Sequence, residues 1–308
     1  MTAAVVFAYH NVGVRCLEVL RAQDVRVPLV VTHRDAPGET LWFGSVAAAA
    51  ARHGIETAAP TDPNQPDFIA RVRALEPDFL FSFYYRLLLA PALLAAPRRG
   101  AFNMHGSLLP KYRGRAPVNW AIVKGERETG ATLHEMVAKP DAGRIVDQQA
   151  VPILPDDTAR EVMDKVTVAA EIVLDRALPR LIAGTAALRP QDLAGGSYFR
   201  GRRPADGRID WTRPAREIHD LVRAVAPPYP GAFGDLRGKT LRVLRTRHAA
   251  SARAIPGAPT LLAEDDRLYL RCADGGLLQV LEAELDGAPL RAADLPARLG
   301  ALSIPLLG

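Results

Sequence analysis

The sequence is poor in several features that define other classes of protein. Its 308 residues include only two cysteines, Cys16 and Cys272, which are too few for a disulfide framework and lack the spacing of a zinc site. No apolar run has the length that a membrane helix requires, and no basic segment precedes the apolar run at the N-terminus as in a signal peptide. These absences predict a soluble protein of a reducing compartment, the cytoplasm, with no membrane partner.

Lysine is scarce as well, with five residues against 34 arginines, and the formal net charge is +5. Arginine suits the recognition of carboxylates and phosphates, but a GC-biased coding sequence also produces it, so the charge only weakly indicates anionic ligands. The arginines are dispersed along the chain, which argues against a nucleic-acid-binding arm. The sequence has no HExxH, EF-hand or P-loop motif, and no metal is expected.

Short apolar runs alternate with helix-like segments in the first part of the chain. Strands are expected at 3–8, 28–32 and 78–83, and helices at 14–22, 40–52, 66–75 and from a cap at 156–158 to about 182, with a polar turn at 9–13. This alternation predicts an α/β fold with a parallel sheet whose ligands bind at the carboxyl ends of the strands. The first turn offers only Gly13 in place of a GxGxxG motif, which disfavours a dinucleotide cofactor.

The character of the sequence changes after residue 189. Residues 190–204 contain Pro, Gly and Arg in the manner of a linker. Short strand-like runs separated by Gly, Pro and Asp follow, at 241–245, 260–262, 268–272 and 277–281. They predict a small β-rich domain. We therefore expect a catalytic domain at 1–189, a linker at 190–204 and a β-rich domain at 205–308.

The densest group of chemically useful residues lies between Ala101 and Trp120. Asn103 and His105 are two residues apart at an expected strand end, so the period of two places them on one face. An amide and an imidazole on one face can serve acyl transfer, since the amide can hold a developing oxyanion while the imidazole moves a proton. The alternative is a structural histidine beside an asparagine that bonds a turn.

Asp141 is a candidate partner for this imidazole. It lies in a turn formed by Pro140 and Gly143. A carboxylate that faces an imidazole fixes the tautomer of the ring, as in serine proteases. The alternative is a turn aspartate that bonds its own backbone.

Other polar residues are weaker candidates. The loop at 106–117 is either an anion site or an ordinary solvated loop, and its basic residues are Lys111, Arg113 and Arg115. His10 and His33 follow the first two expected strands, where ligands of α/β proteins bind. The remaining histidines are expected to be surface or structural residues; they are His53, His134, His219 and His248.

Three motifs follow one another in a fixed order across the first domain. They are Asn103-x-His105-x-Ser107-Leu108-Leu109-Pro110, Tyr112-Arg113-Gly114-x-Ala116-Pro117 and Asp141-x-Gly143. The ordered set resembles the folate-dependent formyltransferases, a superfamily that includes methionyl-tRNA formyltransferases and sugar N-formyltransferases. The resemblance covers nearly the whole chain. It implies a Rossmann-like formyltransferase domain with a parallel sheet, followed by a small OB-like barrel.

Further segments narrow the resemblance. They lie at 5–10, 37–39, 81–86, 113–120, 201–203, 224–226 and 230–233. These segments are similar to the formyltransferase domains of the ArnA family of bifunctional polymyxin-resistance proteins. That similarity implies transfer of a formyl group to the 4-amine of UDP-4-amino-4-deoxy-L-arabinose, a step of lipid A modification. The dehydrogenase half of those proteins is not in this sequence, so only formyl transfer is implied. A separate dehydrogenase chain of the same pathway is a candidate partner, and the sequence does not decide whether it associates.

The resemblance also implies roles for individual residues. Asn103 and protonated His105 hold the oxyanion, His105 moves the proton, and Asp141 supports the imidazolium. The formyl donor is N10-formyltetrahydrofolate, and the positions that match its binding residues are Leu87, Leu88, Leu89, Arg115, Val137, Ala138, Lys139, Pro140 and Asp141. The segment Leu87–Leu89 is more apolar than the His-containing segment of the ArnA family.

Three other functions compete with this interpretation. A methionyl-tRNA formyltransferase would bind the phosphates of the acceptor stem with basic residues; the candidates are Arg200, Arg202, Arg203 and Arg208. A formyltransferase for another nucleotide-linked amino sugar would share the catalytic motifs. A folate-binding or scaffold protein would keep the fold without turnover, but the intact set of Asn103, His105 and Asp141 argues against it.

Overall fold

The computed structural model describes residues 1–35, 38, 40–249 and 257–307, so Pro37 and Glu39 of the resemblance lie outside the described residues. The chain divides into two compact units. The first contains residues 1–117, 128–152 and 163–200, and the second contains 118–127, 153–162 and 201–308. Two short segments of the predicted first domain, 118–127 and 153–162, thus group with the second unit. No helix among the described residues is long and apolar enough to cross a membrane.

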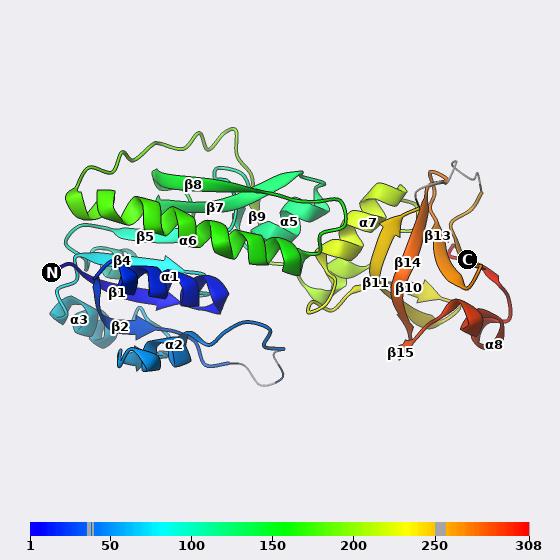
Figure 1. Ribbon diagram of the computed structural model, residues 1–308, viewed down its shortest axis with the longest axis horizontal. Helices are drawn as coiled ribbons and strands as arrows, with labels where there is room; N and C mark the ends of the chain where they lie inside the picture. The colour runs from blue at the N-terminus through cyan, green and yellow to red at the C-terminus, as the bar shows by residue number, and fades with distance from the viewer. Residues whose placement is uncertain (36–37, 39, 250–256, 308) are drawn as a thin grey trace. The chain divides into compact units, whose positions relative to one another are not determined.

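The first unit is built on a seven-stranded sheet with the order β3-β2-β1-β4-β5-β7-β8 (Figure 1). Its strands are β1 (Ala3–Ala8), β2 (Arg26–Val31), β3 (Thr57–Ala58), β4 (Phe79–Phe83), β5 (Ala101–His105), β7 (Glu128–Glu135) and β8 (Ile145–Pro152). The strands from β3 to β5 pair in parallel, as predicted. The pairs β5–β7 and β7–β8 are antiparallel, so the sheet is mixed rather than parallel throughout. A short loop is enough to join antiparallel neighbours, and β7–β8 therefore needs no crossover helix.

Helices cover the sheet of the first unit. They are α1 (His10–Ala22), α2 (Val46–Arg52), α3 (Pro66–Ala74), α4 (Pro91–Leu94) and α6 (Ala159–Ala183). Figure 1 shows α1 beside α6, and Arg15 of α1 forms an ion pair with Glu171 of α6. Val5 and Phe7, which alternate along β1, share a core cluster with Ile69 and Val72 of α3. This alternation follows from the period of two in a strand.

Two predicted helix starts are wrong. The expected polar turn at 9–13 is the first turn of α1, because the chain changes direction at His10, whose φ is 66°. The helix expected from residue 40 begins only at Val46. Ser45 caps it by accepting a hydrogen bond from the Ala48 amide at 3.2 Å.

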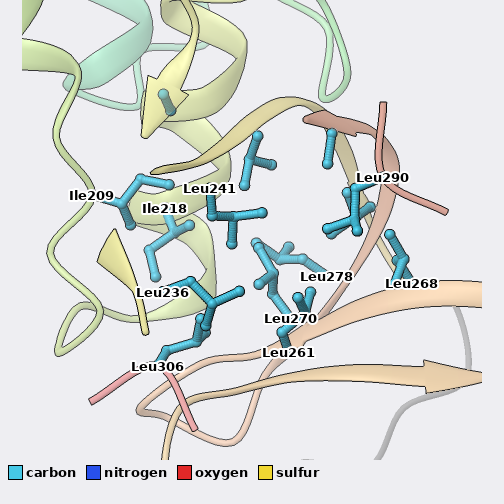
Figure 2. Packing of buried hydrophobic residues seen from close by; sticks show 14 of the residues in the cluster. Ile209, Ile218, Leu236, Leu241, Leu261, Leu268, Leu270, Leu278, Leu290 and Leu306 are labelled. Carbon is cyan, nitrogen blue, oxygen red and sulfur yellow. The ribbon is translucent and has the colours of Figure 1, made fainter. Parts of the chain in front are cut away.

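The second unit is β-rich, as predicted. Its strands are β10 (Ala232–Leu236), β11 (Lys239–His248), β12 (Thr260–Glu264), β13 (Arg267–Arg271), β14 (Leu277–Leu285), β15 (Ala288–Pro289) and β16 (Ser303–Pro305). They pair in antiparallel fashion in the order β10-β11-β14-β13-β12-β16, with β15 on β14. The helices are α5 (Pro117–Val123), α7 (Ala215–Ala224) and α8 (Leu295–Leu299), with 3-10 turns at Pro204–Gly207 and Ala292–Asp294. Figure 2 shows the core, a cluster that contains Ile218 of α7 together with Leu241, Leu270 and Leu278 of the sheet.

Part of the predicted linker is structured. Strand β9 (Tyr198–Phe199) pairs in parallel with β6 (Arg113–Gly114), which lies within the second motif. The Arg113 amide donates to the Ser197 carbonyl and the Arg115 amide to the Phe199 carbonyl, both at 3.0 Å. We call residues 190–200 the strap, because they hold the loop at 106–117, which carries parts of the first two motifs and which we call the motif loop.

Candidate functional site

Strand β5 positions the first two predicted catalytic residues. It lies between β4 and β7, and Phe102 and Met104 alternate with Asn103 and His105 along it. Phe102 and Met104 are buried, which fixes the strand and leaves the other face for the polar pair. The His105 side chain is itself 7% exposed, so its surroundings are largely desolvated.

Asp141 lies in the loop between β7 and β8, which we call the aspartate loop, and its φ is 53°. Its Oδ1 atom is 3.6 Å from Nδ1 of His105. Its Oδ2 atom accepts a hydrogen bond from the Gly114 amide at 2.8 Å. Asn103 joins this pair through His134, whose Nε2 is 3.1 Å from Asn103 Nδ2 and 3.5 Å from Asp141 Oδ1, so the three predicted catalytic side chains lie in one cluster of the first unit.

The charge of the Asp141 carboxylate is stabilised by its neighbours. Burial raises the pKa of this carboxyl. The charge of the His105 imidazolium and the hydrogen bond from the Gly114 amide lower it by more, so the pKa lies well below the ordinary value of 3.8. Asp141 is therefore a fixed negative charge at neutral pH.

Both ring nitrogens of His105 face oxygen atoms. Nε2 donates to the Tyr112 carbonyl at 2.8 Å, and Nδ1 faces Asp141. Carbonyl and carboxylate oxygens accept hydrogen bonds, so this arrangement suits the imidazolium, which carries a proton on each nitrogen. The Tyr112 carbonyl is in turn held by the motif loop, where the Ser107 hydroxyl donates to the neighbouring Lys111 carbonyl at 2.6 Å.

His134 is a residue that the sequence analysis missed, since it was expected to be a surface or structural histidine. It is 2% exposed and lies opposite Asn103 on β7. Its Nε2 atom is 3.1 Å from Asn103 Nδ2 and 3.5 Å from Asp141 Oδ1. The only sequence signal for it is its place in an alternating run, Thr132-Leu133-His134, that could have been recognised as a strand.

The strap supplies a second residue that was missed. Gln191 Nε2 donates to the Asp141 carbonyl at 3.1 Å and to the Gly143 carbonyl at 2.6 Å. The Ser197 hydroxyl accepts from the Tyr112 amide at 2.8 Å. The strap thus holds both the aspartate loop and the motif loop, and no local pattern in 190–200 indicates this.

The segments predicted to bind the folate donor also come together. Arg115 Nη2 donates to the Arg86 carbonyl at 2.8 Å, beside Leu87 and Leu88. Leu89 belongs to a core cluster against which Met136 packs, and Val137 follows Met136. Three apolar side chains near this cluster are exposed: Leu87 is 39%, Leu88 is 71% and Val137 is 41% exposed. Exposed apolar side chains beside a cationic group fit a flat ring with an anionic tail.

Other residues that were predicted to bind the donor or an anion do not come together in one site. Ala138 and Lys139 are exposed in the aspartate loop, and no hydrogen bond or ion pair ties the Lys139 side chain to the described residues. Among the basic residues of the motif loop, Lys111 is exposed and Arg113 is buried, so they do not form one open anion site. Within the described ranges no group of three His, Cys, Asp or Glu side chains is arranged to hold a metal ion.

The two histidines after the first strands lie in an aromatic cluster. The His10 ring is 4.5 Å from the Trp42 ring and 4.4 Å from the Phe43 ring, between centroids. The His33 ring stacks on Tyr85 at 4.1 Å, and its Nε2 accepts from the Arg86 amide at 3.0 Å. A cavity of about 130 Å³ adjoins His33.

The sequence matches two family models. The formyl transferase model matches residues 8–178, and the model of the formyl transferase C-terminal domain matches residues 202–298. The two matches cover both units of the structure. The families they describe carry out the chemistry for which the cluster around His105 is suited.

Solved structures share the fold. An N-formyltransferase from Helicobacter canadensis, in complex with folinic acid and dTDP-3-aminofucose, is 21% identical with a TM-score of 0.73 over 91% of this chain and 99% of that one. The sugar 3N-formyltransferase WlaRD, with dTDP and 5-N-formyl-THF, is 20% identical with a TM-score of 0.70 over 91% and 97%. A sugar N-formyltransferase from a Shewanella species is 18% identical with a TM-score of 0.63 over 82% and 99%. With the family matches and the site, we conclude that the chain belongs to the formyl transferase family and is a folate-dependent N-formyltransferase.

Proposed function

We propose that the protein transfers a formyl group from N10-formyltetrahydrofolate to the amine of a nucleotide-linked amino sugar. The observation that carries the proposal is the cluster of Asn103, His105 and Asp141, in which the carboxylate lies 3.6 Å from the imidazole. Family membership supplies the reaction. The similarity to two sugar formyltransferases over 91% of this chain supports the class of acceptor.

The residues of the cluster divide the work of acyl transfer. Asn103 Nδ2 donates a hydrogen bond to the formyl oxygen as that oxygen becomes negative during attack by the neutral amine. His105, as the imidazolium, delivers its Nε2 proton to N10, the leaving nitrogen, as the old C–N bond breaks, and regains a proton from the amine that has attacked. Asp141 stabilises the imidazolium with which this cycle begins and ends.

His105 reaches the reacting atoms through Nε2, because Nδ1 faces Asp141. In the structure Nε2 donates to the Tyr112 carbonyl. This hydrogen bond must therefore be exchanged for one to the reacting groups during turnover. The Tyr112 carbonyl holds the ring in place until that exchange.

The donor fits the residues at the neighbouring edge. The pterin ring would cover the apolar side chains of Leu87, Leu88 and Val137, which are otherwise exposed. Arg115, anchored on the Arg86 carbonyl, would meet negative charge on the donor. When bound, the donor supplies the activated formyl group.

The acceptor is proposed as a class. UDP-4-amino-4-deoxy-L-arabinose, indicated by the ArnA-type segments, is one member of it. The two most similar structures described above contain dTDP-3-aminofucose and dTDP, so another nucleotide-linked amino sugar, with dTDP in place of UDP, is the better supported choice. A separate dehydrogenase chain is a candidate partner only if the acceptor is UDP-4-amino-4-deoxy-L-arabinose.

A competition assay tests the proposal. Equal amounts of UDP-4-amino-4-deoxy-L-arabinose, dTDP-3-aminofucose and charged initiator tRNA are incubated with purified protein and N10-formyltetrahydrofolate, and the products are identified by mass spectrometry. We expect one formyl group on a nucleotide sugar and none with the His105→Ala control. Formylation of the tRNA alone, with a steep salt dependence from phosphate contacts, would overturn the proposal.

A further inference from the structure

We propose that His134 is a positioning residue that aims the Asn103 amide at the reacting carbonyl, and that it does so as a neutral ring with its proton on Nδ1. The proposal rests on the formyl-transfer reaction of the family and is independent of which amine accepts the formyl group. It concerns a histidine on β7, whereas Asn103 and His105 lie on β5 and Asp141 lies in the loop after β7.

The backbone next to His134 determines the tautomer of its ring. Nδ1 lies 2.8 Å from the carbonyl oxygen of Glu135. A carbonyl oxygen only accepts hydrogen bonds, so Nδ1 must carry a proton. In the neutral ring the lone pair is then on Nε2, which becomes an acceptor.

Asn103 is the donor that this lone pair selects. Its Nδ2 atom lies 3.1 Å from Nε2 of His134, and the two residues are direct cross-strand partners on β5 and β7. A neutral Nε2 accepts one of the two Nδ2 hydrogens and so excludes the flipped amide, in which the side-chain oxygen would face the lone pair. The second Nδ2 hydrogen is left to bind the oxyanion.

Asp141 determines which of the two rings carries charge. Its Oδ1 atom lies 3.6 Å from His105 Nδ1 and 3.5 Å from His134 Nε2, and the two ring centroids are 6.5 Å apart. One carboxylate faces two buried rings, so two imidazolium ions would repel each other with only one compensating charge. Nε2 of His134 has a hydrogen-bond donor, Asn103 Nδ2, as its nearest partner, whereas Nε2 of His105 faces the Tyr112 carbonyl, an acceptor, so His105 is the ring that carries the charge.

The other charged group beside His134 does not change this assignment. The Glu135 carboxylate is engaged by Arg144, whose Nε and Nη2 each donate to it at 2.9 Å. That ion pair lowers the pKa of the Glu135 carboxyl by more than partial burial raises it, so the pKa lies below its usual range. The hydrogen bond from the His134 ring goes to the backbone carbonyl of Glu135, while the Glu135 carboxylate is paired with Arg144.

A matched pair of substitutions separates positioning from structural support. His134→Gln places an amide oxygen near the position of Nε2 and retains an acceptor for Asn103. His134→Asn retains a donor near Nδ1 for the Glu135 carbonyl but has nothing at Nε2. We expect kcat to fall roughly 10- to 100-fold in His134→Asn, since a loosened oxyanion donor loses part of its effect, and less than about fivefold in His134→Gln.

A double-mutant cycle shows whether the effect passes through Asn103. In the Asn103→Ala background, His134→Asn should cost less than about twofold in kcat, because the group that it positions is already gone. KM for donor and acceptor should change little in all variants, and His53→Ala, at an exposed ion pair with Glu18, is the control. Equal losses in both backgrounds, or rescue by Asn rather than Gln, would overturn the proposal.

A spectroscopic measurement needs no acceptor and keeps the test separate from the proposed function. Nitrogen-15 NMR of the histidine rings in the full chain should show His134 as the neutral Nδ1–H tautomer at pH 7. A neutral Nε2–H tautomer, or an imidazolium at that pH, would refute the inference even if the enzyme proved to formylate some other amine. The same spectra of His134→Gln identify the His134 signals by their loss.

Discussion

Asp141 and His105 meet at 3.6 Å between Oδ1 and Nδ1, although one lies in the loop after β7 and the other ends β5. Two further contacts make this approach specific. The Gly114 amide donates to the second carboxylate oxygen of Asp141, and Gln191 of the strap donates to the Asp141 carbonyl. The carboxylate is thus aimed at the imidazole by the backbone of one loop and a side chain of another.

The three clustered side chains should act as one unit. Asn103→Ala should lower kcat about 10²- to 10³-fold, because it removes a donor from the developing oxyanion. His105→Ala and Asp141→Ala should each lower kcat by orders of magnitude while the protein stays folded. The measurement is single-turnover formyl transfer with the acceptor that the competition assay identifies.

The losses from these three substitutions should be strongly non-additive, as for residues that share one transition state. The triple variant should be little slower than His105→Ala. Near-normal turnover in purified His105→Ala would show that another group moves the proton. Losses that simply multiply would show that the residues act independently.

The depressed pKa of Asp141 makes the free energy of unfolding depend on acid pH. A carboxyl whose pKa is lower in the folded chain stabilises that chain above its ordinary value of 3.8 and loses the contribution as pH falls through the folded value. Wild type should therefore lose stability relative to Asp141→Asn as the pH falls from about 5 to about 3.

Urea unfolding of both proteins at several pH values measures this difference. Near pH 5 the difference should change little with pH, because Asp141 is ionised in both the folded and the unfolded chain. A difference that stays constant down to about pH 3 would mean that the folded protein does not hold the carboxylate in its charged form.

Local patterns in the sequence were enough to predict the parallel strands and to place Asn103 and His105 on one face of a strand end. Val5 and Phe7 lie in one buried run, and Asn103 and His105 share a face by simple alternation. The β-rich second unit was also evident from its spacing of turns. In each case the determining interactions are between residues close together in the chain.

Long-range contacts explain what the sequence analysis missed. His134 matters because β7 pairs with β5 in a register that sets it opposite Asn103, and register is not visible in one strand alone. Gln191 matters because the strap returns to the aspartate loop. The start of α1 was misplaced because His10 adopts a positive φ, which is uncommon for a non-glycine residue and which the local pattern does not indicate.

A substitution at Gly114 tests whether the pairing of β6 with β9 of the strap positions the Asp141 carboxylate. Its φ is 97°, and a Cβ there would collide with the Phe199 carbonyl of β9. Gly114→Ala should destabilise the protein by about 2–4 kcal/mol, more than the 1–2 kcal/mol or so of a left-handed residue alone. It should also reduce kcat at least about tenfold, because the amide that holds Asp141 is displaced.

Gly54→Ala is the matched control for Gly114. Gly54 has a φ of 64° and open space around it, so the substitution pays only the backbone penalty. It should cost about 1–2 kcal/mol of stability and leave kcat unchanged. Thermal unfolding and turnover of both variants are compared. Similar effects of the two substitutions on kcat would contradict the role given to the β6–β9 pairing.

A substitution at Leu88 tests whether the pterin ring of the donor covers the exposed apolar side chains of Leu87, Leu88 and Val137. Its side chain is 71% exposed, so Leu88→Ser should change stability by less than about 0.5 kcal/mol. Because covering a leucine side chain contributes about 1.5–3 kcal/mol, the KM for N10-formyltetrahydrofolate should rise roughly tenfold or more, with kcat and the acceptor KM little changed. Leu302→Ser, at an apolar side chain that is 57% exposed in the second unit, should leave all three constants as they are. A donor KM unaffected by Leu88→Ser would place the pterin ring elsewhere and leave the exposure of Leu87, Leu88 and Val137 without a functional reason.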